Sequence, residues 1–489
     1  MPKGLFVKKT IKSLLDEAQE TRHGLRRSLG AINLTAMGVG AIIGAGIFVL
    51  TGPAAAEYAG PGILLSFVIS AIICVLAALC YAEFASLIPI SGSAYTYAYA
   101  TMGELIAWII GWGLTMEYLF SAATVSVGWS AYFVSLLNDF GLNIPKCIAA
   151  APINYELSTG WTQTGSVINL PAVVIVALIG LLVAVGIKAA ASFNNLMVII
   201  KLGAIALFIA CGIAYINMDN LTPFIPENTG TFGEFGFSGV LRGAGVVFFA
   251  FIGFDALSTM AQECRNPQKH LPIGMLGSLG ISTLVYVIIG LVLLGVVSYT
   301  TLNVPDPISV AVAALGPKFV WLRFVIKLAI LAGLTSVVLV MILGQSRIFY
   351  TMSRDGLLPK SFAKISDRFH TPFTSTALVT LACMILAGIF PVAILGQLTN
   401  MGALLAFAIV CFGILVLRYK QPTLHRPFKT PFVPWVPLAG TLVCVIQLLA
   451  FPGVTWMQFI IWMAIGCVIY FGYSVKNSQA RLALVKKKK

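Results

Sequence analysis

Apolar and polar residues follow one another along this 489-residue chain in long blocks, with runs of about 20 apolar residues separated by short polar segments. A run of that length crosses the hydrocarbon core of a bilayer as a helix. A repeated series of short strands with alternating polarity does not occur, which disfavours a membrane-spanning barrel. The pattern predicts an all-α integral membrane protein of twelve transmembrane helices, with boundaries accurate to about three residues: 31–57, 62–88, 103–137, 167–187, 192–216, 238–262, 272–298, 319–347, 374–391, 397–417, 434–452 and 455–474.

Composition and charge agree with this assignment. Hydrophobic residues make up 59% of the chain and charged residues 10%, with a mean hydropathy of +0.95. When the N-terminus is placed in the cytoplasm, 25 of the 31 Lys and Arg residues fall in cytoplasmic segments, and the external loops keep only Lys146 and Lys318. This positive-inside bias predicts cytoplasmic termini, an amphipathic segment at 1–29 and a basic tail at 475–489. The net charge of +14 therefore indicates membrane topology and no nucleic-acid partner.

The cysteine, histidine and nucleophilic residues do not show the sequence spacings typical of metal sites, cofactor sites or catalytic sites. The nine cysteines show no CxxC spacing and the four histidines form no HExxH pattern. No nucleophile and base are spaced as a convincing pair. We therefore expect no metal, no cofactor, no disulfide and no enzymatic activity.

The first apolar run contains "GVGAIIGAGIF", with glycines at 38, 40, 44 and 46. A glycine inside a helix costs about 1 kcal/mol relative to alanine. Close packing of helices through small residues is one explanation, since Gly40 and Gly44 are four residues apart. The other explanation is a helix that unwinds in mid-membrane, where freed backbone groups line a cavity or hold a ligand.

A second interruption favours unwinding. The sixth run, "GVVFFAFIGFDALST", is broken by Gly253 and the acid Asp255, and each interruption opens a set of five predicted helices. Paired interruptions in corresponding halves of a chain are typical of inverted-repeat transporters and point to their binding site.

Four stretches carry a resemblance to a known family: "GVGAIIGAGIFVLTG", "LCYAEFASLIPISGSAYTYAYATMGE", "FFAFIGFDALSTMAQECRNPQKHLPIG" and "GQSRIFYTMSRDGLLPKSF". In this order they resemble the amino acid–polyamine–organocation superfamily, and most closely its cationic amino acid transporter branch of bacterial type. The resemblance covers nearly the whole chain. It implies a LeuT-like 5+5 inverted repeat with discontinuous first and sixth helices, a first repeat at 30–217, a second at 238–418 and two additional helices at 434–474.

The resemblance implies an amino-acid clamp at the two breaks. The N–H groups that begin the second half-helix suit a substrate carboxylate, because a helix N-terminus carries partial positive charge. Freed carbonyl groups suit the substrate ammonium. Phe249 is the expected aromatic gate, with Phe251 as the alternative. The implied contacts are Ile42, Ile43, Gly44, Ala45, Gly46, Phe249, Ala250, Phe251 and Ile252.

Lys201 lies about 10–15 Å into the fifth run at a helical rise of 1.5 Å per residue. The resemblance places its ammonium where sodium-coupled relatives hold a sodium ion between helices one and eight. Burial favours the neutral form of a lysine, so Lys201 can exchange a proton, and proton coupling without sodium is expected. Snorkelling of the side chain to the interface is the alternative.

Glu117 and Met341 bear on the substrate in opposite directions. A carboxylate at Glu117, in the middle of the third helix, suits a cationic side chain, or acts through water on a neutral substrate. Its alternative role is structural. The resemblance places Met341 on the pocket floor, where a bulky side chain excludes arginine and favours alanine-sized substrates. Packing in the core or toward lipid is the alternative for Met341.

Most of the remaining charged residues in or near the apolar runs are expected to have structural roles. Asp255 is expected to cap the second half of helix six. We expect Glu83 and Glu263 to form ion pairs near cytoplasmic helix ends. Arg323 is expected to snorkel outward, and Lys327 has no clear role, with Glu57 as a possible partner.

The predicted function is secondary active L-amino acid transport in the plasma (inner) membrane by alternating access. Proton symport of small or medium neutral amino acids is the first expectation. A cationic amino acid transporter or an exchanger is the alternative, and a transporter-like nutrient sensor is a remote one. A channel is disfavoured by the paired half-helices. Oligomeric state and accessory subunits stay open.

Overall fold

The computed structural model describes residues 6–10, 14, 28–156, 160–304, 306–451 and 453–486. Most of the expected amphipathic segment 1–29 and the last residues of the basic tail lie outside the described residues.

Among the described residues of the first half of the chain, the regular structure is helical apart from one hairpin, and η marks the 3-10 and π segments. Its helices are α2 (Ala31–Ile42), η2 (Gly46–Leu50), α3 (Thr51–Ala54), η3 (Ala55–Ala59), η4 (Gly60–Gly62), α4 (Ile63–Leu87), α5 (Ser93–Thr101), α6 (Glu104–Thr115), η5 (Met116–Phe120), α7 (Ser121–Asp139), α8 (Lys146–Ala149), α9 (Leu170–Val185), α10 (Ile187–Gly212), η6 (Ile213–Tyr215) and η7 (Met218–Leu221).

The second half continues with helices of similar length. They are α11 (Gly236–Val247), η8 (Phe248–Phe251), η9 (Asp255–Glu263), α12 (Pro267–Val296), η10 (Tyr299–Thr301), α13 (Pro307–Ala314), η11 (Pro317–Phe319), α14 (Val320–Arg354), η12 (Lys360–Ala363), α15 (Phe373–Ile389), α16 (Val392–Lys420), α17 (Trp435–Leu449), α18 (Gly453–Ile469), η13 (Tyr470–Ser474), α19 (Val475–Asn477) and α20 (Gln479–Lys486).

Eight helical stretches of the described chain are long and apolar enough to cross a membrane, and the shorter helices α9, α15 and α17 are also apolar. The first of the eight, Ala31–Leu87, contains the first two predicted runs. Every predicted apolar run lies on one of these helices. The protein is therefore a helical, multi-pass membrane protein.

Helix boundaries differ from the apolar runs where charges or glycine intervene. Helix α14 continues to Arg354, past the predicted end at 347, because hydropathy marks the bilayer rather than the end of a helix. Helix α10 begins at Ile187 rather than 192, directly after Gly186, whose φ of 142° ends α9. Such a φ is open to glycine and strained for other residues.

A short antiparallel hairpin was not predicted. Strands β1 (Ile153–Glu156) and β2 (Gly160–Gln163) pair with Ile153 opposite Gln163 and Glu156 opposite Gly160. The hairpin follows α8 in the connection between α7 and α9.

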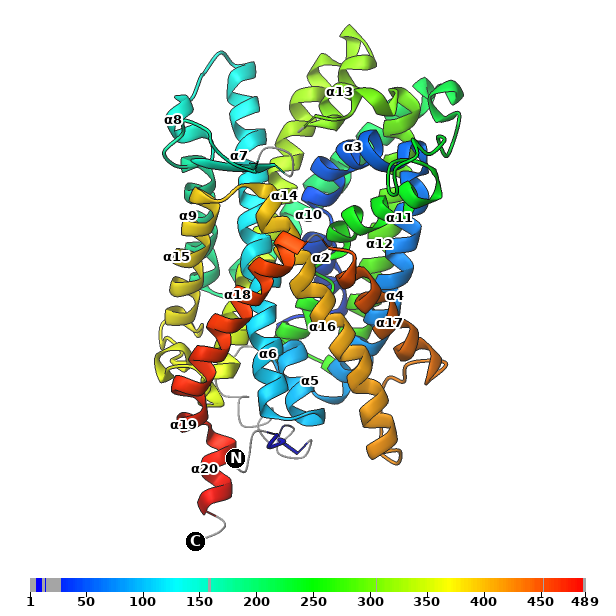
Figure 1. Ribbon diagram of the computed structural model, residues 1–489. Helices are drawn as coiled ribbons and strands as arrows, with labels where there is room; N and C mark the ends of the chain where they lie inside the picture. Colours follow the sequence, from blue (N-terminus) through cyan, green and yellow to red (C-terminus); the bar gives the residue numbers. More distant parts are fainter. Residues whose placement is uncertain are drawn as a thin grey trace.

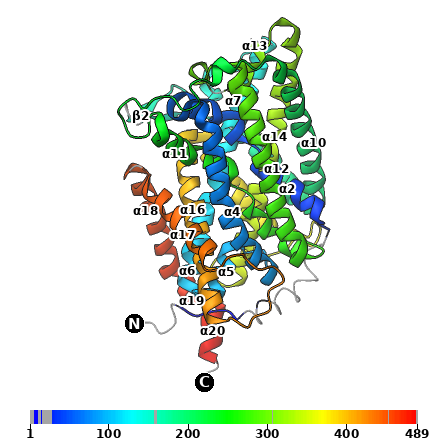
Figure 2. The ribbon, with the colours of Figure 1, turned by 90° about the vertical axis from the view of Figure 1, so that its right-hand side faces the viewer.

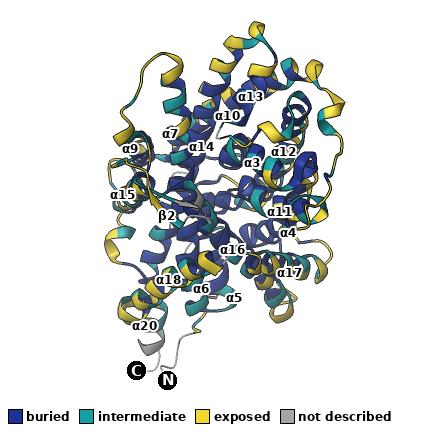
Figure 3. Cartoon of the chain, turned by 45° about the horizontal axis from the view of Figure 1, so that its top comes forward, coloured by how far each residue is buried: buried dark blue, intermediate teal, exposed yellow. Residues whose placement is uncertain are grey.

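The helices pack in two groups that meet at the centre of the molecule. Helices α2 and α4 both pack along α12, whereas α14 packs against α7 and α10 (Figures 1 and 2). Helix α2 also contacts α10 and α14, so it lies between the groups. Figure 3 shows buried residues gathered in the interior and exposed residues at the periphery. Large apolar side chains are more than half exposed on the outer helices, as expected of a lipid-facing surface, among them Leu178, Leu181, Ile199, Leu284, Leu442 and Ile460.

Candidate functional site

The first transmembrane run is broken at residues 43–45. Helix α2 ends at Ile42, and Ile43 turns to an extended ψ of 100° before η2 begins at Gly46. In a helix each N–H group bonds to a carbonyl group several residues earlier in the same helix. The first N–H groups of the second half-helix have no such carbonyl group, so they lack intrahelical partners. Unwinding, expected from the glycines, is therefore present in the structure.

The sixth run is broken at residues 252–254. Segment η8 ends at Phe251, Ile252 has an extended ψ of 135°, and Gly253 has a φ of 122°. The chain then continues as the 3-10 helix η9, with Asp255 in its first turn and no side-chain capping hydrogen bond at its N-terminus. The capping role expected of Asp255 therefore stays a prediction. A side chain at position 253 is disfavoured twice, because a Cβ atom would also lie 2.8 Å from the Cβ of Ala41.

The two breaks contact each other. A Cβ atom built on Gly46 would lie 2.2 Å from the Cβ of Ala250, so only glycine permits this approach. The hydroxyl group of Tyr286 lies 2.7 Å from the carbonyl oxygens of both Ile42 and Ala250. Tyr286 thus bridges the breaks from α12. Sequence reasoning missed this residue, although it is a single tyrosine inside the apolar run "TLVYVIIGLVLLG".

Other glycines of the opening motif serve packing. Cβ atoms at Gly38, Gly40 and Gly44 would clash with Ser278, Asn194 and Val337, at 2.4, 2.6 and 2.6 Å. These contacts lie on α12, α10 and α14. The two explanations of the glycines therefore both hold: some permit unwinding and some permit close helix packing.

Several carbonyl groups expected to hold a substrate ammonium already have protein partners. Tyr286 shares its one hydroxyl hydrogen between Ile42 and Ala250, Lys201 donates to Ile43 at 2.8 Å, and the N–H of Ile252 donates to Phe249 at 3.3 Å. A carbonyl oxygen has two lone pairs, so each of these groups can accept a second hydrogen bond.

The three phenylalanines beside the second break differ in their packing. Phe248 packs edge-on against Phe407, and Phe251 packs against Phe67 and Tyr286. Among the ring pairs of the described residues, none involves Phe249, and its side chain is 6% exposed whereas the other two are fully buried. Phe249 is thus the ring with the fewest aromatic restraints at the break.

Lys201 is fully buried and its ammonium group joins α2 to α14. The Nζ atom donates to the carbonyl oxygens of Val39, Gly40 and Ile43 at 3.0, 2.9 and 2.8 Å, and lies 3.1 Å from the Oγ of Ser336. The Ser336 hydroxyl in turn lies 2.9 Å from the Gly40 carbonyl oxygen. Four oxygen atoms surround one cation at the C-terminal end of α2, where the helix dipole favours positive charge.

The structure brings Met341 and Glu117 to the same central region. Met341 is fully buried on α14, and its Cε atom would lie 3.0 Å from a Cβ at Gly253. Glu117 is fully buried in the π turn η5, and neither of its carboxyl oxygens has a hydrogen-bond partner. The neighbouring Tyr118 donates its hydroxyl hydrogen bond to the carboxylate of Asp255.

The suggested pairing of Lys327 with Glu57 is wrong. Lys327 is fully buried and pairs with Asp139 at 2.5 Å, with the Oγ of Ser135 at 2.9 Å. Arg323, 44% exposed, reaches the same carboxylate at 3.5 Å. Glu57 instead accepts a hydrogen bond from Asn303. Helix α14 packs against the end of α7. The sequence did not indicate that these two helices are neighbours, so the pairing of Lys327 with Asp139 was not predicted.

Buried ion pairs at the ends of α4 and η9 agree with the expectation for Glu83 and Glu263. Arg347 of α14 pairs with Glu263 at 2.8 Å, and both side chains are buried. The Glu263 carbonyl oxygen also accepts the N–H groups of Ser28 and Leu29, at 3.0 and 3.1 Å. The segment that leads into α2 is therefore attached to the end of η9.

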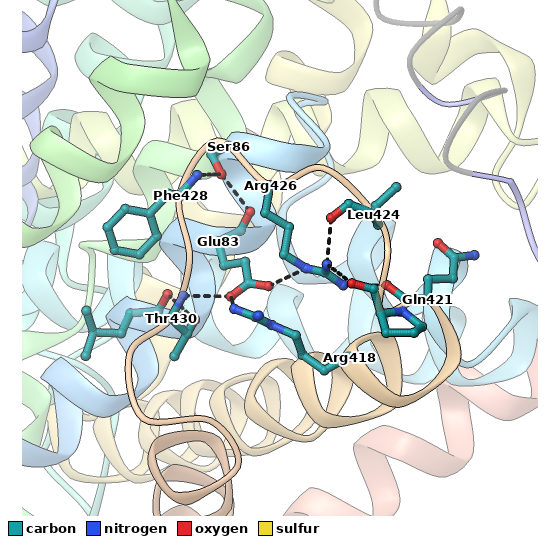
Figure 4. Close-up of polar contacts among 10 residues, drawn as sticks. Glu83, Ser86, Arg418, Gln421, Leu424, Arg426, Phe428 and Thr430 are labelled. Carbon is teal, nitrogen blue, oxygen red and sulfur yellow. Dashed lines mark hydrogen bonds and ion pairs between the residues drawn. The ribbon is translucent and has the colours of Figure 1, made fainter.

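Glu83 forms a second buried hub, shown in Figure 4. Its carboxylate lies 2.9 Å from the guanidinium groups of both Arg418 and Arg426 and accepts the Thr430 N–H at 2.7 Å. Arg426 donates further to the carbonyl oxygen of Gln421 at 2.8 Å. The carboxylate thus fixes the connection between α16 and α17 onto the end of α4.

Replacing Glu83 with glutamine is expected to destabilise the protein by about 3–5 kcal/mol, the range for breaking a buried ion pair. The change would leave Arg426 without its counter-charge and weaken the contact with Arg418. Thermal unfolding in detergent measures the effect. Glu57→Gln, which removes an exposed carboxylate, serves as the control. Equal melting temperatures for the two variants would show that the Glu83 hub does not support the fold.

Comparisons with known proteins agree with this architecture. Residues 29–473 match the family model described as amino acid permease. The chain is 44% identical to a methylthioribose transporter of Bacillus subtilis (strain 168), over 97% of this chain and 98% of that protein. It is 43% identical to the branched-chain amino acid permease BcaP of the same organism, over 98% and 99% of the two chains. It is 31% identical to the human cationic amino acid transporter 4, over 84% of this chain and 62% of that protein. The chain therefore belongs to the amino acid permease family, as a transporter of the amino acid–polyamine–organocation superfamily close to the cationic amino acid transporters.

Proposed function

We propose that the protein is a secondary active transporter that carries small or medium neutral L-amino acids, together with protons and without sodium, across the plasma membrane. Both termini face the cytoplasm in this proposal. The substrate binds between the two broken helices, and alternating access moves it from one side to the other.

The contact between the two helix breaks is the observation that carries the proposal. Gly46, at the start of η2, packs directly against Ala250 of η8. The Ala250 carbonyl oxygen accepts from Tyr286 and has a second lone pair for a substrate ammonium. An α-amino acid carries a carboxylate and an ammonium on one carbon atom, and these backbone groups complement both charges. Phe249 closes over the bound substrate, since its ring has no aromatic partner among the described residues to hold it back.

Met341 limits the size of the substrate side chain. Its side chain abuts the second break at Gly253, so it occupies the space beyond the backbone clamp. The branched-chain amino acid permeases of Bacillus subtilis and Lactococcus lactis, 43% and 34% identical, support medium apolar side chains. Glu117 contacts the substrate directly or through water.

Proton coupling is assigned to Lys201. As an ammonium it occupies a cation site between α2 and α14. Loss of one proton would remove the positive charge and leave two N–H donors for three carbonyl acceptors, which weakens the attachment to the end of α2. Protonation and the conformation of the broken helix are therefore linked, as coupled equilibria require.

The proposed motion is a rocking of the helices built on α2, α4, η8–η9 and α12 against the rest of a 5+5 inverted repeat. The repeats span 30–217 and 238–418, with the helices of 434–474 outside them. Packing of α2 and α4 along α12 supports a single moving unit. The ion pair between Glu263 and Arg347 spans the boundary between this unit and α14, and the Glu83 hub connects the unit to α16.

Uptake into sodium-free proteoliposomes tests the proposal. Labelled L-alanine and L-leucine are expected to accumulate faster with an inward proton gradient, and L-arginine is expected to be excluded. Met341→Ala should admit larger side chains, because truncation removes the part of the side chain that lies next to Gly253 and leaves a cavity there. Val340→Ala, on the same helix, is the control. Arginine uptake by the native protein would instead favour the cationic alternative, with Glu117 as the selecting residue.

Methylthioribose is a second candidate substrate, favoured by the 44% identity to a methylthioribose transporter over nearly the full length of both chains. The same vesicles distinguish the two. Competition by unlabelled methylthioribose against labelled leucine, or its own uptake in the absence of amino acid uptake, would favour this substrate.

A further inference from the structure

Two carboxyl groups, Glu117 of η5 and Asp255 of η9, face each other in the interior of the protein. Tyr118, which follows Glu117 in η5, donates its hydroxyl hydrogen bond to Asp255. Both side chains are fully buried. Asp255 follows the break at Gly253 by two residues, and η9 then continues to the ion pair between Glu263 and Arg347. The carboxyl pair therefore lies between the proposed substrate site and that ion pair.

No lysine or arginine of the described chain pairs with either carboxyl group. Both oxygens of Glu117 and the Oδ1 of Asp255 are without hydrogen-bond partners, and Tyr118 donates to the other oxygen of Asp255. Arg347, on the neighbouring α14, is instead paired with Glu263.

The groups that face the pair are neutral. The titratable groups that interact with it are Cys74 and Tyr81 of α4, Tyr97 of α5 and Tyr118 of η5, and Ser258 of η9 lies near Tyr97. Among the described residues, the buried oxygen atoms of Tyr81, Tyr97 and Ser258 lack hydrogen-bond partners. The surroundings thus offer several free hydrogen-bonding atoms and no compensating charge.

Adjacent carboxylates cannot both ionise in a site that excludes water and contains no cation. Such a pair is stable when it retains one proton, which belongs to the pair rather than to either residue. Lys201 differs in this respect, because its ammonium is compensated by three carbonyl oxygens and a hydroxyl group.

We propose that Glu117 and Asp255 form a proton-binding site that holds one exchangeable proton and passes it on during transport, separately from Lys201. The pair binds the proton from water while the protein is open to the side of higher proton concentration and holds it while the site is sealed, as it is here. It releases the proton to water when opening on the other side hydrates the two carboxyl groups. The inference rests on the proposed transport function. It adds a second protonation site to the pathway and gives Glu117 a role beyond contact with the substrate.

The test compares Glu117→Gln and Asp255→Asn with the native protein in proteoliposomes. An amide resembles a protonated acid in shape but cannot exchange a proton. In both variants we expect an inward proton gradient to lose its stimulation of leucine uptake. The dependence of the uptake rate on pH should also flatten. Both effects are expected with or without a change in the KM for leucine. Asp255→Glu, which retains a carboxyl group, is expected to recover part of the stimulation. Glu57→Gln, an exposed carboxylate outside the pair, should leave the stimulation unchanged.

An infrared measurement on the substrate-free protein separates this inference from the transport proposal. We expect the absorption of a protonated carboxyl group in the native protein, reduced in both single variants. If the native protein moves no amino acid, the transport proposal fails, and the infrared result still decides whether the pair holds a proton. A native-like pH profile in both variants, or a change in KM alone for Glu117→Gln, would overturn the proton site.

Discussion

Lys201→Met is expected to abolish uptake and to lower the thermal stability of the protein. Methionine preserves most of the volume of the lysine stem but cannot donate hydrogen bonds. The carbonyl groups of Val39, Gly40 and Ile43 would each lose a buried partner. The Val39 carbonyl keeps the N–H of Ile43 and the Gly40 carbonyl keeps the hydroxyl of Ser336. An unsatisfied buried group costs about 1–3 kcal/mol, so loss of the bond to Ile43 alone would destabilise the end of α2 by at least about 1 kcal/mol. Uptake with and without a proton gradient, and thermal unfolding in detergent, measure the two effects.

Lys188→Met provides the matched control on the same helix, because Lys188 is exposed at the start of α10. That variant should retain native uptake and stability. A Lys201→Met protein that unfolds at the native temperature and still responds to the proton gradient would contradict both the structural and the coupling role of Lys201. A protein that is unstable but still coupled would leave the ammonium as a structural cation only.

Gly46→Ala is expected to reduce uptake by about 5- to 150-fold, which corresponds to the 1–3 kcal/mol typical of an overpacked core. The new Cβ would lie 2.2 Å from the Cβ of Ala250 and 2.3 Å from its Cα, so a side-chain rotation cannot relieve the clash. The two breaks must move apart, and the backbone groups of the proposed clamp would no longer face one another. Initial rates of leucine uptake provide the measurement.

Gly203→Ala is the control, since a Cβ at that position on α10 meets nothing within 4 Å. The double variant Gly46→Ala with Ala250→Gly removes the clash with the Cβ but keeps the clash with the Cα, so it should recover only part of the activity. Native uptake by Gly46→Ala alone would show that the contact between the breaks is dispensable.

Much of the architecture was predictable from local pattern. Long apolar runs predicted the helices, because the hydrocarbon core of a bilayer imposes both length and polarity on a spanning segment. The interruptions at Gly44–Gly46 and Gly253 were also predictable. Glycines and an acid in the middle of an apolar helix are costly, and such a cost is tolerated where the backbone has another use.

The site was predictable only in part, because its polar groups are satisfied by residues distant in the sequence. Lys201 was recognisable as a buried charge, but its three carbonyl acceptors lie about 160 positions earlier in the chain. Tyr286 gave no signal beyond its isolation in an apolar run, although it joins both breaks. The ion pair of Lys327 with Asp139 was missed, because it depends on which helices are neighbours.

The sequence by itself determined that this is a helical membrane protein with two interrupted helices, a positive-inside charge bias and a family assignment that the comparisons confirm. These properties depend on the surroundings of each segment alone. A segment in lipid must be apolar and must satisfy its own backbone hydrogen bonds, and basic residues favour the cytoplasmic loops. Only the tertiary structure decided that Gly46 touches Ala250, that Tyr286 closes the gap between the breaks and that Glu117 meets Asp255. Such contacts depend on how helices pack against one another, and apolar helices in a membrane can pack in many ways that hydropathy does not distinguish.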